Sequence, residues 1–362
     1  MNSKSSVSTL LININEYDKL GDSHNMLSTA QQLLAKDPHN GEYMLYQLKA
    51  LEGLGSITKH LSTLENYANV RSTDVTAFVL LYRAYIERND IGSAIIALAF
   101  ALSVDPNDEE CLNLLISVLK EVDPKYTRVK INIITTPRIG HLACEIEPLF
   151  RQKEGEGENH CLYLFIYGGS FVANHYLFNV LKGMAHVIEN KFLFNLFASR
   201  PTLLDDFFYA EFPYDLTNQL RGVPEDEINT NGINNLVDIY NKHPICTEIP
   251  SSDKDKAWSL LSEYGIKKED KLVTFHIRDS AYLSEKFRQR DFSYHNFRDA
   301  DIATYLPAIE YLIAQGYKVC RIGADTNQEL AINSPSYFDF CVNRDEKNGD
   351  FLEVFLIAES EF

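Results

Sequence analysis

The sequence lacks the cysteine pattern of a disulfide framework or of a zinc site. Its six cysteines are scattered, no two of them form a CxxC pair, and most lie inside apolar runs: Cys111, Cys144, Cys161, Cys246, Cys320 and Cys341. Zinc sites and small disulfide scaffolds need cysteines at short, regular spacings. We therefore expect reduced core cysteines and no bound metal.

Long hydrophobic runs are also missing. The longest apolar stretch, residues 93–104, is shorter than the about 20 residues that a membrane-spanning helix needs. The first 20 residues contain only a short apolar run and no small-residue cleavage site, so they do not resemble a secretory signal. The sequence predicts a cytoplasmic protein with no transmembrane segment.

Positive charge is scarce. The chain of 362 residues has 34 Lys and Arg against 51 Asp and Glu, which gives a net charge of -17. Such a field repels nucleic acid and anionic lipid, so nucleic acid is not an expected partner. The length allows two or three domains, and a hydrophobic content of 45% is ordinary for globular proteins.

Two phosphate-binding motifs are absent. Neither GxxxxGK[ST] nor GxGxxG occurs in the chain, which argues against P-loop kinases and dinucleotide-dependent oxidoreductases.

The N-terminal third contains an internal repeat. Its Asp-Pro pairs end at Pro38 and Pro106, which are 68 residues apart, twice the 34-residue period of a tetratricopeptide repeat (TPR). The middle copy is degenerate, because Ser72 stands where the proline belongs. We predict three TPR-like helix pairs and a closing helix over residues 7–122; a generic antiparallel helical bundle is the alternative. Such stacks bind a protein partner on the concave face or serve as packing elements.

After Pro124 the hydrophobic pattern changes to alternating strands and helices. Residues 129–134 and 161–167 read as buried strands, each followed by a glycine-containing turn, and residues 271–277 and 317–323 repeat this plan. The pattern predicts parallel sheets, which bind ligands at the carboxyl ends of their strands. We place domains at 128–250 and 251–362 and expect deletion of residues 1–122 to leave a soluble α/β remainder.

The strand at 271–277 runs into a group of ionisable side chains. The segment from His276 to Arg298 has five basic residues against three acidic ones, in a chain that is acidic overall. A local basic excess at a strand end is typical of an anion site, and guanidinium groups match the oxygens of a diphosphate. The alternative is a solvated ion pair of Arg278.

Three separated segments carry a resemblance. "PRIGHLACEIEPLF" (137–150), "FHIRDSAYL" (275–283) and "FSYHNFRDADIATYLPAIEYLIAQGYKVCRIG" (292–323) occur in the order seen in a bacterial family of glycosyltransferases that the chain resembles over roughly residues 128–358. The His-x-Arg element at His276 is also similar to the His-x-Arg-Arg element of fucosyltransferases that use GDP-fucose. Asp279 stands where the second arginine of that element belongs.

The resemblance implies a GT-B fold of two Rossmann-like lobes behind the helical repeats. Residues 128–250 would form the acceptor-side lobe and residues 251–362 the nucleotide-sugar-side lobe. It implies metal-independent transfer of a sugar from a GDP- or UDP-linked donor to a polysaccharide or protein-glycan acceptor, with no cofactor. The alternative function is a TPR scaffold that carries an inactive or truncated transferase lobe.

The resemblance and the strand ends together give the candidate site residues. Arg278 would contact the diphosphate and His276 would orient the site, while His141 is either the base for the acceptor hydroxyl or a helix cap. Arg138, Gly140 and Asn174 are the substrate-binding candidates on the acceptor side. On the donor side Arg298 or Arg288 would support Arg278, and Tyr294, His295 and Asn296 would shape the donor pocket. The other substrate-binding candidates are Asp279, Tyr282, Arg321 and Gly323.

The last twelve residues, "FLEVFLIAESEF", read as a helix that gives way to the start of a strand. A nucleotide-binding lobe of this type normally continues, so we expect an incomplete second lobe with little transferase activity. The apolar face of the helix at 350–358, formed by Phe351, Val354, Phe355 and Ile357, would then have incomplete cover, and amide exchange would be fast from about Asn343 onward.

Overall fold

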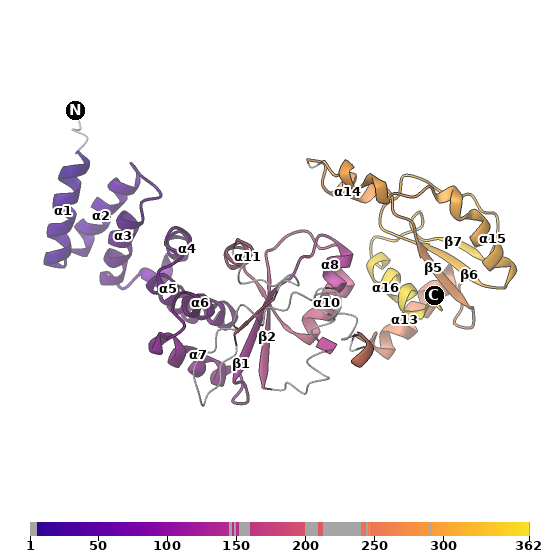
Figure 1. Cartoon of the computed structure of the whole chain (residues 1–362), viewed down its shortest axis with the longest axis horizontal. Helices are drawn as coiled ribbons and strands as arrows, with labels where there is room; N and C mark the ends of the chain where they lie inside the picture. The colour runs from indigo at the N-terminus through magenta and orange to yellow at the C-terminus, as the bar shows by residue number, and fades with distance from the viewer. Residues whose placement is uncertain are drawn as a thin grey trace. The chain divides into compact units, whose positions relative to one another are not determined.

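The computed structural model describes residues 6–144, 147, 150–151, 160–199, 209–212, 240–243, 245, 247–289 and 291–361. The chain divides into two compact units (Figure 1). The first comprises Met1–Phe171 and Lys182–Pro244, and the second comprises Val172–Leu181 and Ile245–Phe362.

The first unit begins with antiparallel helix pairs. The helices are α1 (Val7–Leu20), α2 (Ser23–Leu34), α3 (Gly41–Gly53), the 3-10 turn η1 (Ile57–Lys59), α4 (Leu61–Val70), α5 (Val75–Glu87), α6 (Ile91–Val104) and α7 (Glu109–Val122). Most of them are preceded by an N-cap residue whose side chain accepts a hydrogen bond from a backbone N–H of the first turn. These N-caps are Ser6, Asp22, Asn40, Asp74, Asp90 and Asp108. These bounds match the predicted pairs over 7–108 and the closing helix at 109–122.

A four-stranded sheet follows the helices. Its strands are β1 (Arg128–Ile133), β2 (Cys161–Tyr167), β3 (His186–Glu189) and β4 (Tyr209–Phe212), in the order β3-β2-β1-β4. The first three are mutually parallel, and β4 is antiparallel to β1. Helices α8 (Ile139–Cys144), α10 (His175–Met184) and α11 (Lys191–Ala198) lie between the strands in sequence. Strands β3 and β4 were not predicted, because each is only four residues long.

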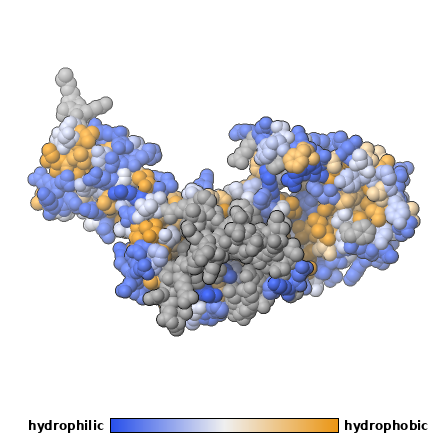
Figure 2. Space-filling model, viewed as in Figure 1, coloured by the Kyte–Doolittle hydropathy of each residue, from blue (hydrophilic) through white to orange (hydrophobic). Residues whose placement is uncertain are grey.

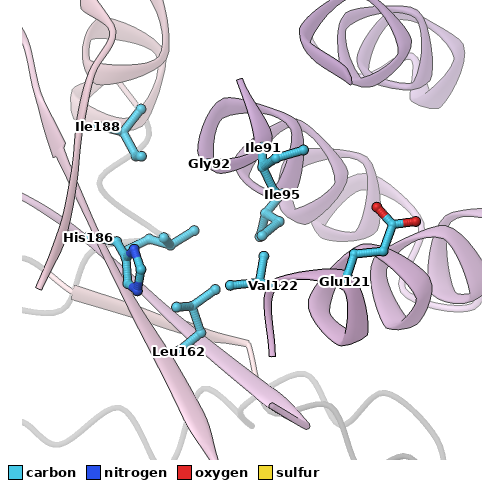
Figure 3. A pocket seen from close by; sticks show the side chains of 9 residues that line it. Ile91, Gly92, Ile95, Glu121, Val122, Leu162, His186 and Ile188 are labelled. Atoms are coloured by element: carbon cyan, nitrogen blue, oxygen red, sulfur yellow. The ribbon is translucent and has the colours of Figure 1, made fainter. Parts of the chain in front are cut away.

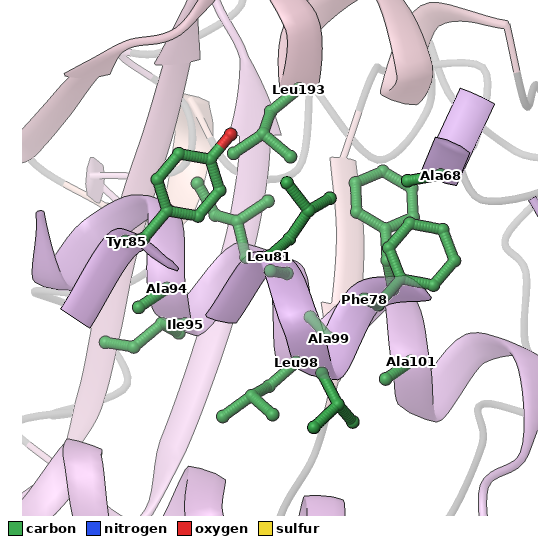
Figure 4. Close-up of a cluster of buried hydrophobic side chains, with 14 of the residues drawn as sticks. Ala68, Phe78, Leu81, Tyr85, Ala94, Ile95, Leu98, Ala99, Ala101 and Leu193 are labelled. Atoms are coloured by element: carbon green, nitrogen blue, oxygen red, sulfur yellow. The ribbon is translucent and has the colours of Figure 1, made fainter. Parts of the chain in front are cut away.

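Helices α3 to α7 and this sheet share one hydrophobic core (Figure 4). Helix α6 is buried on all sides from Ser93 to Leu102. The ring of Phe100 stacks on Phe78 at 5.5 Å and meets Phe197 of α11 edge-on at 5.3 Å. The same cluster contains one face of β1 and β2: Val129, Ile131, Ile133, Leu162, Leu164 and Ile166. The predicted boundary near residue 124 therefore does not coincide with a break in the core.

Close approach and polar contacts fix α6 against the sheet. A Cβ atom on Gly92 would lie 2.1 Å from Cδ1 of Ile188 in β3, so any larger residue there would require the Ile188 side chain to move. The Asn190 amide donates to the Tyr85 hydroxyl and to Ser93 Oγ, each at 3.1 Å. These contacts make the last helix pair a structural layer of the first unit.

The second unit is built around a smaller parallel sheet. Its elements are α13 (Ser251–Glu263), β5 (Leu272–His276), α14 (Ala281–Lys286), η3 (Ser293–Arg298), η4 (Ile302–Tyr305), α15 (Leu306–Ala314), β6 (Lys318–Ile322), β7 (Tyr337–Asp339) and α16 (Gly349–Glu359). The strand order is β5-β6-β7, with all three parallel. Helices α13 and α16 share a core with one face, and Phe275 of the other face stacks on Tyr305 of η4.

The prediction that the C-terminal helix lacks cover is wrong for its main apolar side chains. Phe351 and Phe355 of α16 are buried, and Trp258 of α13 packs edge-on against Phe355 at 5.1 Å. Arg344 bonds to Asp350 at 2.6 Å and to Glu353 at 2.9 Å, which ties the start of the helix to the preceding loop. The sequence pattern did not show that α13 supplies this cover.

We expect the amides of Phe355 and Leu356 to exchange slowly with solvent, in place of the fast exchange expected from the sequence. Both residues are fully buried within α16, so exchange there requires opening of the shared core of α13 and α16. Hydrogen exchange followed by mass spectrometry of C-terminal peptides measures this. The peptide that covers exposed helix α14 is the internal comparison, and equal exchange rates in both would contradict the packing.

Among the residues that the structure describes, no helix combines the length and the apolar character that crossing a bilayer requires.

Candidate functional site

The candidate site lies in the second unit, where the three parallel strands end. His276 is the last residue of β5, Gly323 follows β6, and Cys341 comes shortly after β7. A Cβ atom on Gly323 would lie 3.0 Å from Cys341 Sγ and 3.6 Å from His276 Cδ2, so the three residues are neighbours. Gly323 also has a φ of +146°, which other residues rarely adopt. We call His276, Arg278, Gly323 and Cys341 the strand-end site.

The imidazole of His276 is a neutral group in this setting. His276 is exposed as a whole residue, yet the protein atoms close to its ring displace part of the surrounding water and lower its pKa below the ordinary value, and the positive charges of Arg321 and Arg278 act in the same direction. Glu353 and Asp279 oppose the shift. At pH 7 the ring therefore has one nitrogen that donates a hydrogen bond and one that accepts.

Burial raises the pKa of the Cys341 thiol to about 12. The thiol is therefore protonated at pH 7 and is a weak nucleophile. Cys341 shapes the strand-end site without supplying a thiolate.

Arg278 forms an ion pair with Asp299, and both side chains are about one-fifth exposed. The backbone supports this arrangement, because the Ala300 N–H donates to the Arg278 carbonyl at 3.0 Å. The alternative raised from the sequence, a solvated ion pair of Arg278 with the adjacent aspartate, is right that the guanidinium is paired but wrong in the partner, which is Asp299 and not Asp279. An anion entering the site would compete with the Asp299 carboxylate for the guanidinium.

Asp279 holds the loop after β6. One carboxylate oxygen accepts the Asn327 N–H at 2.8 Å and the Thr326 hydroxyl at 3.0 Å, and the other accepts the Ala281 N–H at 2.8 Å. Both oxygens of the Asp279 carboxylate therefore accept hydrogen bonds from groups of the protein itself. Where a fucosyltransferase-like element would have a second arginine, this chain has an acidic side chain that joins two loops.

Arg321 is buried, with only 1% of its surface exposed. Its guanidinium donates to the Gln328 carbonyl at 2.6 Å, to Asp339 Oδ2 at 3.1 Å and to the Thr326 hydroxyl. Arg321 therefore fixes the β6 loop from inside the protein, and its contacts are with protein atoms.

Several predicted donor-site residues lie on an exposed arm formed by α14, the following turn and η3. Tyr294 is 64% exposed, and Asn296 and Arg298 are exposed as well. Arg288 pairs with Glu285 at the surface, and Tyr282 is half-buried beneath. The side chain of His295 lies outside the described residues.

The predicted acceptor-side residues Arg138, Gly140 and His141 lie in the first unit, at the start of α8 beyond the end of β1. Gly140 is exposed, while Arg138 and His141 are half-buried. The loop before them is anchored by Thr136, whose hydroxyl donates to the Phe171 carbonyl at 2.8 Å.

Asn174 was predicted on the acceptor side, yet its side chain is completely buried. Its Oδ1 accepts the Leu177 N–H at 2.8 Å, and its Nδ2 donates to the Asp350 carbonyl at 2.9 Å. The residue belongs to the second unit, where it caps α10 and attaches that helix to α16. An asparagine directly before a helical run is a typical N-cap, so the sequence contained this signal.

The first unit contains a cavity of about 380 Å³ that the sequence did not predict (Figure 3). It lies between α6 and α7 on one side and β2 and β3 on the other. Its walls are mainly aliphatic, and His186 and Glu121 are its ionisable lining residues.

Sequence analysis missed Asp299, Thr326 and Cys341. Asp299 and Cys341 are distant in sequence from the residues that they contact, and Thr326 contacts both nearby Arg321 and distant Asp279. None of the three belongs to a recognisable motif. Within the described ranges, no group of three or more His, Cys, Asp or Glu side chains is arranged to hold a metal ion.

No protein-family model matches the chain, and no curated protein matches it either. Solved structures show partial likeness. The crystal structure of MamA is 19% identical over 33% of this chain and 64% of its own, with a TM-score of 0.31. The first TPR of Spaghetti (RPAP3) bound to an HSP90 peptide is 18% identical over 32% of this chain and 90% of its own, with a TM-score of 0.29. A mutant Thermobaculum terrenum O-GlcNAc transferase is 14% identical over 55% of this chain and 44% of its own, with a TM-score of 0.27.

The chain thus spans about two thirds of MamA and less than half of the transferase. At the coarse level, it combines TPR-like helix pairs with two small, mainly parallel sheets.

Proposed function

We propose that the chain is a glycosyltransferase that binds a nucleotide sugar, GDP- or UDP-linked, at the strand-end site. The observation that carries the proposal is that His276, Gly323 and Cys341 are neighbours at the carboxyl edge of a parallel sheet, with Arg278 two residues after His276. Ligands of open α/β sheets bind at this edge. The resemblance of the sequence to a transferase family gives the reaction class, and the GT-B arrangement of the two sheets is part of the proposal.

In the proposed reaction the guanidinium of Arg278 leaves its ion pair with Asp299 and binds the diphosphate of the donor instead. Its guanidinium offers paired donors to the phosphate oxygens and stabilises the charge that develops on the leaving group, with no metal or cofactor involved. The neutral His276 donates a hydrogen bond that orients the sugar phosphate, and Gly323 lets the ligand approach the backbone closely. Asp279 and Arg321 position the β6 loop.

The acceptor is a polysaccharide or a protein glycan in this proposal. Arg138, Gly140 and His141 of the first unit would contact it, with His141 as the base for the attacking hydroxyl.

A scaffold function is the second candidate. The Arg278–Asp299 ion pair favours it, because a satisfied pair needs no ligand. In that case the strand-end site is structural, and a protein partner binds on the concave face of the TPR-like helices.

Calorimetry with GDP and UDP distinguishes the two candidates. We expect a nucleoside diphosphate to bind, and Arg278→Ala to weaken its affinity by about 10- to 150-fold, or about 1.5 to 3 kcal/mol, the scale of a hydrogen bond to a charged group. Arg83→Ala is the matched control, because Arg83 also pairs with an acid, Glu110, but lies in the helical pairs. Absence of binding by the unmodified protein, or equal affinity in Arg278→Ala, would leave the scaffold function.

A further inference from the structure

The exposed arm, residues 281–289 and 291–298, presents aromatic side chains to solvent. Phe297 is 84% exposed, more than any other large hydrophobic side chain in the part of the chain that the structure describes, and Tyr294 is 64% exposed. Aromatic residues of this size usually bury most of their surface. Two strongly exposed rings on one short turn, η3, therefore indicate a surface that binds something.

The arm is supported from behind by a chain of rings. Centroid distances are 6.4 Å from Tyr282 to Phe287, 5.8 Å from Phe287 to Phe292, and 6.3 Å from Phe292 to Tyr294. These contacts hold the ring of Tyr294 in place. A preorganised ring loses little conformational entropy when a ligand stacks on it.

Basic side chains accompany the rings. Arg298 follows Phe297 directly and is exposed, and Arg288 is 72% exposed. The pair of Arg288 with Glu285 lies at the surface, where ion pairs contribute little and exchange partners easily. Figure 2 shows hydrophobic and hydrophilic residues side by side over α14 and the segment after it. In a chain of net charge -17, this combination favours an anionic ligand with flat apolar faces.

We propose that the arm binds an acidic oligosaccharide, which is the acceptor of the transfer reaction. The C–H faces of pyranose rings would stack on Tyr294 and Phe297, the Asn296 amide would bond to hydroxyls, and Arg298 would pair with a carboxylate through its planar fork. This inference rests on the proposed function and narrows it, since it names the class of acceptor. It also moves Tyr294, Asn296 and Arg298 from a donor pocket to a separate surface.

The test uses the full chain with tetragalacturonate as the acidic probe and maltotetraose as the neutral one. We expect tetragalacturonate to bind at least about 10-fold more tightly than maltotetraose, a ratio worth about 1.4 kcal/mol. Phe297→Ala should weaken binding of both sugars about 10-fold, and Arg298→Gln should weaken binding of the acidic sugar alone. Both side chains are exposed, so melting temperatures should stay unchanged.

Tyr311→Ala is the matched control, because Tyr311 of α15 is also 64% exposed but lies outside the arm. It should bind tetragalacturonate like the unmodified chain. The proposal is overturned if Tyr311→Ala loses as much affinity for tetragalacturonate as Phe297→Ala does, or if Phe297→Ala loses none. It is also overturned if single-stranded oligothymidylate of the same charge binds as tightly as tetragalacturonate.

Nucleotide affinity separates this inference from the proposed function. Phe297→Ala should bind GDP or UDP like the unmodified chain. If the acidic sugar binds at the arm while no nucleotide binds anywhere, the arm remains a glycan surface and the transferase function fails.

Discussion

Removal of residues 1–122 is expected to leave a polypeptide whose first sheet does not fold. The deletion removes α3 to α7 from the core that covers one face of β1 and β2, and α11 remains as the cover that the structure describes. This face is formed by six aliphatic side chains that are at most 5% exposed in the full chain: Val129, Ile131, Ile133, Leu162, Leu164 and Ile166. Burying one such side chain is worth about 1.5 to 3 kcal/mol, so the loss is on the order of 10 kcal/mol. That is comparable with the entire stability of an ordinary domain.

Solubility on expression and the cooperativity of thermal unfolding measure this outcome. A shorter deletion of residues 1–34 is the control, because most of the buried side chains of the first helix pair belong to a separate small cluster, which includes Leu10, Ile14 and Leu33. That variant should stay soluble and unfold cooperatively. A soluble 123–362 fragment with a sharp unfolding transition would restore the sequence-based expectation of an independent α/β core.

Arg321→Met is expected to lower the free energy of unfolding by about 3 to 5 kcal/mol. The substitution leaves the carboxylate of Asp339, which is 8% exposed, without its cationic partner in the interior. An uncompensated buried charge has a cost of this size. It also removes the donors that hold the Gln328 carbonyl and the Thr326 hydroxyl.

Chemical denaturation of three variants tests the explanation. Arg321→Met combined with Asp339→Leu should recover much of the lost stability, because apolar residues of similar volume tolerate such a site. Arg288→Met, at an exposed pair, should change the stability by less than about 1 kcal/mol. The ion-pair explanation fails if the double variant is no more stable than Arg321→Met.

Helices and strands that are set by interactions between residues close in sequence could be predicted from the sequence. The helix pairs over 7–108 follow from the Asp-Pro register and from capping side chains such as Asp22 and Asp90, which act within one turn. Strand β2 follows from a continuous run of buried apolar residues, and β5 follows from a run of aliphatic, β-branched and aromatic residues. The position of His276 at a strand end follows from the same runs, since the strand stops where ionisable residues begin.

Which helix and sheet faces pack together, and which charged side chains pair, is seen in the tertiary structure alone. The sequence shows that α6 is apolar all round, but not that α11 and the sheet share its core. It places Arg278 at a strand end, but the choice of Asp299 as partner depends on how the chain returns after η3. Asn174 and Arg321 look like site residues in the sequence, and both are buried by segments distant in sequence. Partners of this kind are selected by packing and by the need to satisfy buried polar groups, neither of which a local pattern encodes.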